Sequence, residues 1–229
     1  AELSALEAAL AKPGVHRVVL LTSDKTKGSP VKQKSTFGFS GTETPAGVAV
    51  VADHYWQAER ALAALKIEWD PGAGADWVSS ETIYQAATEY LDAGKGQVMN
   101  KRGDVSAYHS DTVVEASYLT PFCDHVVMEP LNGTAIVTED RVEIWHPCQD
   151  TVQAFWVAVD ESGVRPENVR VNQTYVGGGF GRRTLSAEVR VAVAVAREYP
   201  GVPVKVIWSR EETTRQGKYR QLATAKFSA

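Results

Sequence analysis

Hydrophobic residues recur along this chain with two periods, which predict short strands and short helices. Apolar, valine-rich runs predict strands at residues 15–21 and 47–52. Alternation of apolar and polar residues predicts a hairpin with strands at residues 134–138 and 141–145. Apolar residues spaced three and four apart predict helices over residues 2–11, 55–65, 80–93, 150–160 and 186–199.

The order of these elements predicts a mixed α+β fold. A strand, a helix and a further strand at residues 67–69 follow one another after residue 47, which indicates a small βαβ unit. A run rich in proline and glycine at residues 70–76 is the best linker in the chain. We therefore expect one region over residues 1–70 and a second over residues 71–229.

Composition narrows the class of protein. The 229 residues form one large domain or two modest ones, with 44% hydrophobic and 23% charged residues, as in ordinary globular proteins. The formal net charge of −4 excludes a general nucleic-acid binder, because there is no basic excess to neutralise phosphates. No apolar run approaches the roughly 18 residues that a membrane span needs.

The cysteines and histidines predict no metal site. Cys123 and Cys148 have no metal-ligand spacing, and we expect both to be buried free thiols. None of the 5 histidines stands in an HxxH or HExxH arrangement, so a zinc site is not expected.

The run YVGGGFGRRT at residues 175–184 carries the strongest chemical information. It lies between a predicted strand at residues 169–176 and the predicted helix at residues 186–199. Adjacent glycines let backbone N–H groups approach a ligand closely, and a helix start with Arg182 and Arg183 suits an anion. The spacing fits neither the dinucleotide fingerprint nor the phosphate loop. The run is therefore either a cofactor-binding turn of another kind or a turn that glycine merely makes permissive.

Three segments occur in a fixed order: DHVVMEP at residues 124–130, HPCQDT at residues 146–151 and VGGGFGRR at residues 176–183. In this combination the chain resembles the molybdopterin-binding large subunits of the xanthine dehydrogenase family, the molybdenum hydroxylases. It is most similar to the branch of isoquinoline 1-oxidoreductase and related aldehyde dehydrogenases. The resemblance implies a fragment of such a subunit. Its first region would be the end of an α/β hammerhead-like domain, and its second the first part of a cofactor-binding domain.

The resemblance also implies an oxidoreductase activity. Family members use a molybdenum–molybdopterin cofactor, here expected in the cytosine dinucleotide form, to oxidise an N-heterocycle or an aldehyde with water as the oxygen source. The electrons leave through 2Fe–2S clusters on a small partner subunit. Members of this branch occur in the cytoplasm or are exported, so neither compartment is favoured.

Residue roles carry over to two of the segments. Gln149 matches the glutamine whose side chain donates a hydrogen bond to an oxygen ligand of molybdenum, and Cys148 replaces the family's usual hydroxyl residue. Phe180 matches the position nearest the metal. The resemblance thus implies cofactor binding by Gln149, Gly178, Gly179, Phe180, Gly181 and Arg182.

The substrate side is less defined. Thr184 stands where xanthine-oxidising members have a purine-binding glutamate, which argues against a purine. Glu129 is a candidate either for the substrate channel or for a structural pair with a buried arginine. The family's general base lies later in the subunit, so we expect no catalytic residue before Ala229 and no activity from this chain alone.

An alternative function needs no metal. The glycine-rich run with Arg182 and Arg183 also suits a non-catalytic anion-binding or assembly module. Such a module would bind phosphate without a longer partner.

Overall fold

The computed structural model describes residues 3–21, 46–70, 75, 79–104, 107–215 and 218–229. The chain forms two compact units. The first contains Ala1–Glu68 and His125–Gly217, and the second contains Trp69–Asp124 and Lys218–Ala229. Helices and strands occur in both units, which confirms the predicted mixed α+β fold. The predicted boundary at residue 70 falls beside the point where the chain leaves the first unit, and the two predicted regions stay predictions.

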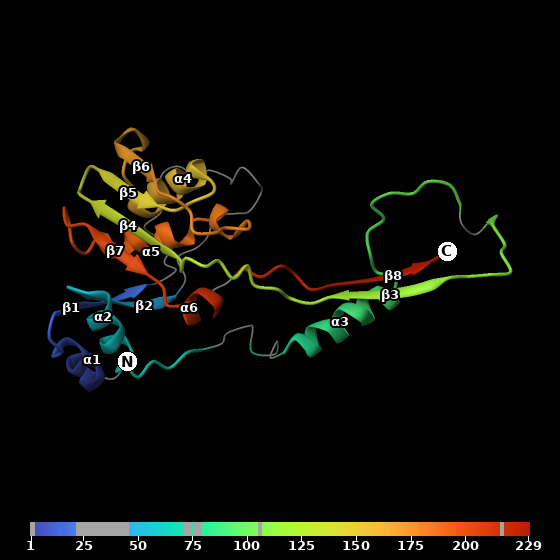
Figure 1. The fold of residues 1–229 in the computed structure, drawn as a ribbon, viewed down its shortest axis with the longest axis horizontal. Coiled ribbons are helices and arrows are strands. Elements are labelled where there is room, and N and C mark those ends of the chain that lie inside the picture. The colour runs from blue at the N-terminus through green and yellow to red at the C-terminus, as the bar shows by residue number, and fades with distance from the viewer. Residues whose placement is uncertain (1–2, 22–45, 71–74, 76–78, 105–106, 216–217) are drawn as a thin grey trace. The chain divides into compact units, whose positions relative to one another are not determined.

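The first unit contains a four-stranded mixed sheet with the strand order β6-β5-β4-β7 (Figure 1). β4 (Asn132–Val137) pairs antiparallel with β5 (Val142–His146), which confirms the predicted hairpin. β5 pairs parallel with β6 (Val169–Gln173), and β4 pairs antiparallel with β7 (Val204–Ile207). Alternate residues of β4 and β5 are buried, so one face of the sheet is covered.

Two helices pack against each other and against this sheet. α4 (Thr151–Ser162) begins after Asp150, whose side chain accepts a hydrogen bond from Gln153 N, and it ends at Gly163 in the left-handed conformation. α5 (Ala187–Ala196) is buried along nearly its whole length. Valine and alanine from both helices fill the core. Shorter helical segments are η4 (Pro166–Asn168), η5 (Arg182–Thr184) and α6 (Arg210–Arg215).

A second strand pair belongs to the same unit. β1 (Val15–Leu21) and β2 (Gly47–Ala52) have the predicted bounds and pair antiparallel, with α1 (Leu3–Leu10) and α2 (Tyr55–Leu62) beside them. The predicted βαβ unit is wrong. β2 takes β1 as its partner, and residues 67–69 form neither a helix nor a strand because no neighbouring strand pairs with them.

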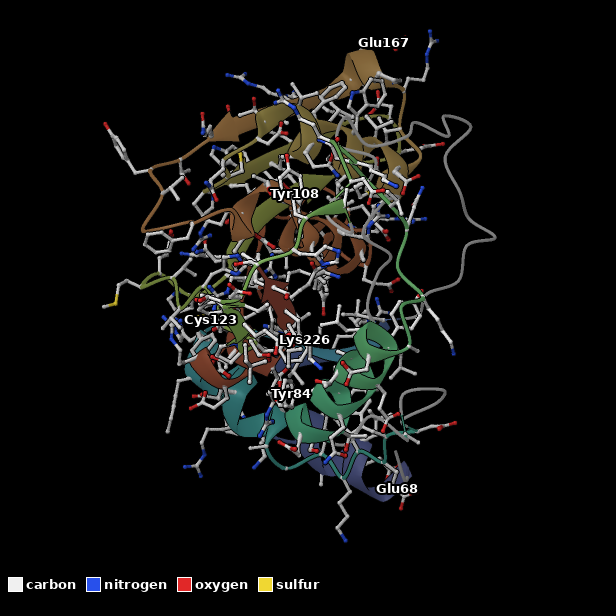
Figure 2. All side chains as sticks on the ribbon, turned by 90° about the vertical axis from the view of Figure 1, so that its right-hand side faces the viewer. Glu68, Tyr84, Tyr108, Cys123, Glu167 and Lys226 are labelled. Carbon is white, nitrogen blue, oxygen red and sulfur yellow. The ribbon has the colours of Figure 1, made fainter. Side chains whose placement is uncertain are left out.

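The second unit combines α3 (Ser80–Asp92) with an antiparallel pair of β3 (Glu115–Thr120) and β8 (Ala223–Ser228). Lys226 on β8 forms an ion pair with the last residue of α3. Figure 2 labels Lys226 together with Tyr84 of that helix. This contact joins the helix to the strand pair.

Both cysteines are free thiols. The prediction that both are buried is right for Cys148 and wrong for Cys123, which lies in an isolated bridge to Arg220 and is exposed (Figure 2). Within the described ranges, no helix has the length and apolar character needed to cross a bilayer.

Candidate functional site

One edge of the four-stranded sheet brings the three sequence motifs together. β5 and β6 run parallel, so both end at this edge, while β4 runs the other way and begins there. The segments after β5, after β6 and before β4 therefore meet, as is common at the carboxyl ends of strands in α/β folds. They carry Gln149, the glycine turn (residues 177–181) and Glu129. Backbone hydrogen bonds join Glu129 N to Gly177 O at 3.1 Å and Gln149 N to Arg183 O at 3.2 Å.

Gln149 is bonded to the glycine turn through its side-chain oxygen. Its Oε1 accepts hydrogen bonds from Gly181 N at 3.0 Å and Arg183 N at 3.3 Å. A Cβ on Gly179 would lie 2.4 Å from this Oε1, so only glycine fits there without a shift of the amide. Gln149 Nε2 donates to no other residue in the described part of the chain. It is therefore left as a donor for a ligand.

The glycine turn adopts repeated left-handed conformations. The φ angles are 97° at Gly178, 52° at Phe180 and 95° at Gly181, and the Phe180 side chain is 73% exposed. The N–H groups of Gly178, Gly179 and Phe180 donate to no other described residue. Successive free N–H groups in such a turn form a concave donor set for anionic oxygen or sulfur.

Arg183 attaches the turn to the segment before β4. Its buried guanidinium donates to the carbonyl oxygens of Gly178 at 2.9 Å, Pro147 at 3.3 Å and Glu129 at 2.6 Å. It also pairs with the Glu129 carboxylate at 3.1 Å. Glu129 Oε2 accepts a further hydrogen bond from Gly177 N at 2.9 Å. The Glu129 carboxylate thus contacts Gly177 at the start of the turn and Arg183 just after its end.

Arg182 points into the core on the other side of the turn. Its side chain is 2% exposed, and its Nη1 lies 3.6 Å from Oε2 of Glu188 in the first turn of α5. Oε1 of Glu188 lies 3.6 Å from Nε2 of His146, the last residue of β5, and both side chains are fully buried. These are ion-pair distances rather than hydrogen bonds, and the facing atoms hydrogen-bond no other described residue.

Burial controls protonation beneath the turn. Burial lowers the pKa of His146 below its ordinary value, while the nearby Glu188 carboxylate opposes this shift. His146 Nδ1 lies 3.0 Å from the Asn132 carbonyl, which can only accept, so Nδ1 carries a proton and Nε2 is the ring atom that faces Glu188. Burial also raises the pKa of the Cys148 thiol, which keeps it protonated and unreactive.

Two local predictions need correction. The strand before the turn ends at Gln173 rather than at residue 176, whereas α5 begins at Ala187, within one residue of the predicted start, with η5 between the turn and the helix. The guanidinium groups of Arg182 and Arg183 are buried against glutamates, so they do not face the exposed side of the turn. The alternative of an anion-binding module built on these two side chains is therefore not favoured.

The two predicted substrate-channel residues are both bonded to the glycine turn. The Thr184 hydroxyl donates to Gly181 O at 2.7 Å. The Glu129 carboxylate contacts Arg183 and Gly177, as its structural alternative requires. A channel role for either residue stays a prediction, as does cofactor contact by Gln149, the turn and Arg182.

Sequence reasoning missed the buried cluster beneath the turn, which consists of Arg182, Glu188 and His146. One indication was available. Glu188 lies in AEVRVAVAVA, and an acidic residue in a segment otherwise suited to complete burial indicates a paired charge. No comparable pattern marked His146, because its partner is distant in sequence.

Known proteins resemble this chain over most of its length. It is 30% identical over 185 residues to a membrane-bound aldehyde dehydrogenase (pyrroloquinoline-quinone) of Gluconacetobacter polyoxogenes, covering 76% of this chain and 23% of the relative. It is 26% identical over 202 residues to isoquinoline 1-oxidoreductase subunit beta of Brevundimonas diminuta, covering 81% of this chain and 25% of the relative. The chain thus spans about a quarter of the length of these relatives.

The fold matches quinoline 2-oxidoreductase of Pseudomonas putida 86 with a TM-score of 0.64 at 23% identity, covering 91% of this chain and 29% of that one. The molybdopterin cofactor-binding domain family matches residues 90–229. The chain belongs to this family, the molybdopterin-binding large subunits of the xanthine dehydrogenase family, as its motifs predict.

Proposed function

We propose that this chain supplies part of the cofactor site of a molybdenum hydroxylase large subunit. The observation that carries the proposal is the meeting of the Gln149 amide with the free N–H groups of the glycine turn at one sheet edge. When bound, the molybdopterin-held metal supplies the oxidation of a substrate carbon with oxygen taken from water. The electrons pass to 2Fe–2S clusters on a small partner subunit.

The donors at this edge fit such a group. Molybdopterin and its metal present anionic sulfur and oxygen atoms, which accept hydrogen bonds. Gln149 Nε2 and the N–H groups of residues 178–180 are neutral donors, which stabilise negative charge without a competing cation. A larger residue at Gly179 would push the Gln149 amide away, so the site depends on that glycine.

Gln149 has its orientation set by the turn that it serves. Because Oε1 is held by two backbone N–H groups, Nε2 is committed to the opposite direction. A preorganised donor loses less entropy when the ligand binds. The exposed Phe180 ring at the tip of the turn would offer a bound substrate an apolar surface.

The substrate is an N-heterocycle or an aldehyde of low polarity. Thr184 offers no carboxylate for a purine, and its hydroxyl is already bonded to Gly181. Several exposed side chains at this end of the unit are large and mainly apolar, namely Phe180, Tyr175 and Met128. A heterocycle such as quinoline, or benzaldehyde, suits this surface better than xanthine.

The test is cofactor analysis of the protein produced at the full length of its natural coding sequence, with its small subunit, in a molybdate-fed host. We expect about one molybdenum atom per large subunit and a released cytosine dinucleotide of the pterin. Oxidation of quinoline or benzaldehyde, without oxidation of xanthine, completes the expected result. A folded, iron-loaded complex that lacks molybdenum, or that releases pyrroloquinoline quinone instead, would overturn the proposal.

A single substitution tests the Gln149 donor. Gln149→Glu keeps an acceptor for Gly181 and Arg183 but removes the Nε2 donor and adds a charge. We expect molybdenum content or turnover to fall about 10–100-fold, which is typical for groups that support a metal centre. Gln153→Glu, on the first turn of α4, is the matched control and should keep wild-type loading. Wild-type loading and turnover in Gln149→Glu would show that the donor has no role.

A further inference from the structure

We infer that Glu188 is a positioning residue, which holds the glycine turn and the Gln149 segment in one relative position by standing between Arg182 and His146. The inference rests on the proposed function only for the ligand of the turn. The three side chains involved are buried and come from three different segments. Glu188 belongs to α5, Arg182 to η5 and His146 to the end of β5.

The distances place Glu188 at the centre of this cluster. Its two carboxylate oxygens face different partners, with Oε2 at 3.6 Å from Arg182 Nη1 and Oε1 at 3.6 Å from His146 Nε2. Neither oxygen hydrogen-bonds any other described residue, and the same holds for the three guanidinium nitrogens of Arg182. Within the described residues, Arg182 and His146 are the ion-pair partners of this carboxylate, and its charge also acts on Arg183.

Each partner leads directly to a segment of the candidate site. Arg182 N donates to Gly179 O at 2.8 Å and closes the tip of the turn around Phe180. His146 ends β5 three residues before Gln149, and its Nδ1 contacts the Asn132 carbonyl at 3.0 Å. A displacement of Glu188 would thus remove one link between the turn and the strand end that carries Gln149, and leave the direct hydrogen bonds of Gln149 to Gly181 and Arg183.

A second polar chain closes the connection from the opposite side. The Asn132 side chain donates to Glu129 Oε1 at 2.9 Å, and Glu129 pairs with Arg183 at 3.1 Å. The polar contacts thus run from one arginine of the turn to the other by way of the sheet edge. The side chains of Glu188 and Arg182 both lack a hydrogen bond to a described residue, and the loss of Glu188 would break the continuity at one place.

A simple core ion pair would behave differently. Replacing a buried pair by apolar residues of similar volume is often neutral for stability, whereas removing one partner leaves an uncompensated charge. If Glu188 only balances the charge of Arg182, the double change Arg182→Met with Glu188→Leu should restore every property. If Glu188 positions the turn, the double variant should fold but lack an ordered turn.

The experiment measures backbone hydrogen exchange by mass spectrometry on the full-length protein with its small subunit. The variants are Glu188→Gln, Glu188→Asp and the double variant. Glu161→Gln is the matched control, because Glu161 of α4 pairs with Arg190, which lies on α5 like Glu188. Molybdenum content is measured on each preparation.

We expect exchange in peptides covering residues 177–184 and 147–151 to rise about tenfold or more in Glu188→Gln and in the double variant, with the rest of α5 and the sheet unchanged in the double variant. Molybdenum content should fall in step, and Glu188→Asp should restore at least part of both. Glu161→Gln should match the wild type. Should Glu188→Gln fail to fold, the double variant alone decides.

Wild-type exchange of the turn in the double variant would overturn the inference, because the turn would then keep its position without Glu188. A rise in exchange spread evenly over the unit would also overturn it, since that pattern reports general destabilisation. If the wild-type complex itself lacks molybdenum, the proposed function fails, and the exchange measurements still decide the role of Glu188.

Discussion

Arg182 and Arg183 are neighbours in sequence, yet the structure uses them in opposite ways. Arg183 donates to several carbonyl oxygens and pairs with Glu129, whose side chain is 31% exposed. Arg182 makes no side-chain hydrogen bond to any described residue and faces the fully buried Glu188 at 3.6 Å. The Arg182 side chain is held by charge alone, and the Arg183 side chain mainly by hydrogen bonds.

This difference separates two ways of fixing a backbone turn. Hydrogen bonds to carbonyl oxygens fix the turn directly, and their loss is local. A buried charge is coupled to its counter-ion in a medium of low polarity, so its loss is felt by every group around it. The comparison predicts that loss of the glutamate lowers stability more in the Arg182–Glu188 pair than in the Arg183–Glu129 pair.

The largest expected effect comes from the buried glutamate. Glu188→Gln leaves the Arg182 charge uncompensated in the core, so we expect the free energy of unfolding to fall by about 3–5 kcal/mol. Glu129→Gln removes a partly exposed carboxylate and should cost only about 1 kcal/mol. Urea unfolding of both variants measures the difference. An equal cost for the two changes would contradict the contrast between the pairs.

Arg183→Met comes next. The buried or part-buried carbonyl oxygens of Gly178, Pro147 and Glu129 lose their donor, so we expect the free energy of unfolding to fall by about 2–4 kcal/mol in the same measurement. The control is Arg165→Met, because Arg165 is exposed and pairs only with the exposed Glu167. That change should stay within about 0.5 kcal/mol. A loss as small as the control's would show that other donors replace Arg183.

Gly179→Ala tests the packing between the turn and Gln149. The new Cβ would lie 2.4 Å from Gln149 Oε1, so the amide must move, and we expect a cost of about 1–3 kcal/mol together with lower molybdenum content. Gly96→Ala serves as the control, because a Cβ there meets nothing within 4 Å. Unchanged stability and metal content in Gly179→Ala would mean that the turn and Gln149 are not tightly packed.

The smallest effect concerns pH. Burial places the pKa of His146 below its ordinary value of 6.5, so the folded state binds fewer protons than the unfolded state. The corresponding stability is present above pH 6.5 and is lost as the pH falls through the folded pKa. Glu188, Arg183 and Glu129 act electrostatically on the same ring. Thermal unfolding should show that the melting temperature of the wild type falls between pH 7 and pH 5, and that it falls less steeply in His146→Gln. Equal slopes of melting temperature against pH in the two proteins would contradict the prediction.

The sequence predicted the local elements well where apolar runs or alternation were strong. β1 and β2 have the predicted bounds, and the β4–β5 hairpin forms as expected. The prediction failed at residues 67–69, where a short apolar run has no strand to pair with. Strand formation depends on a partner, and periodicity alone carries no information about one.

The sequence by itself determined that residues 177–181 form a turn with a side chain only at Phe180, because glycines at the other four positions permit left-handed backbone and close approach. The tertiary structure alone decided which arginine meets which glutamate. Arg183 reaches Glu129 across 54 residues because β5 is hydrogen-bonded to both β4 and β6, so the segments before β4 and after β6 meet. Arg182 turns inward because α5 places Glu188 beneath it. Long-range strand order and helix packing set these contacts, so local sequence could not reveal them.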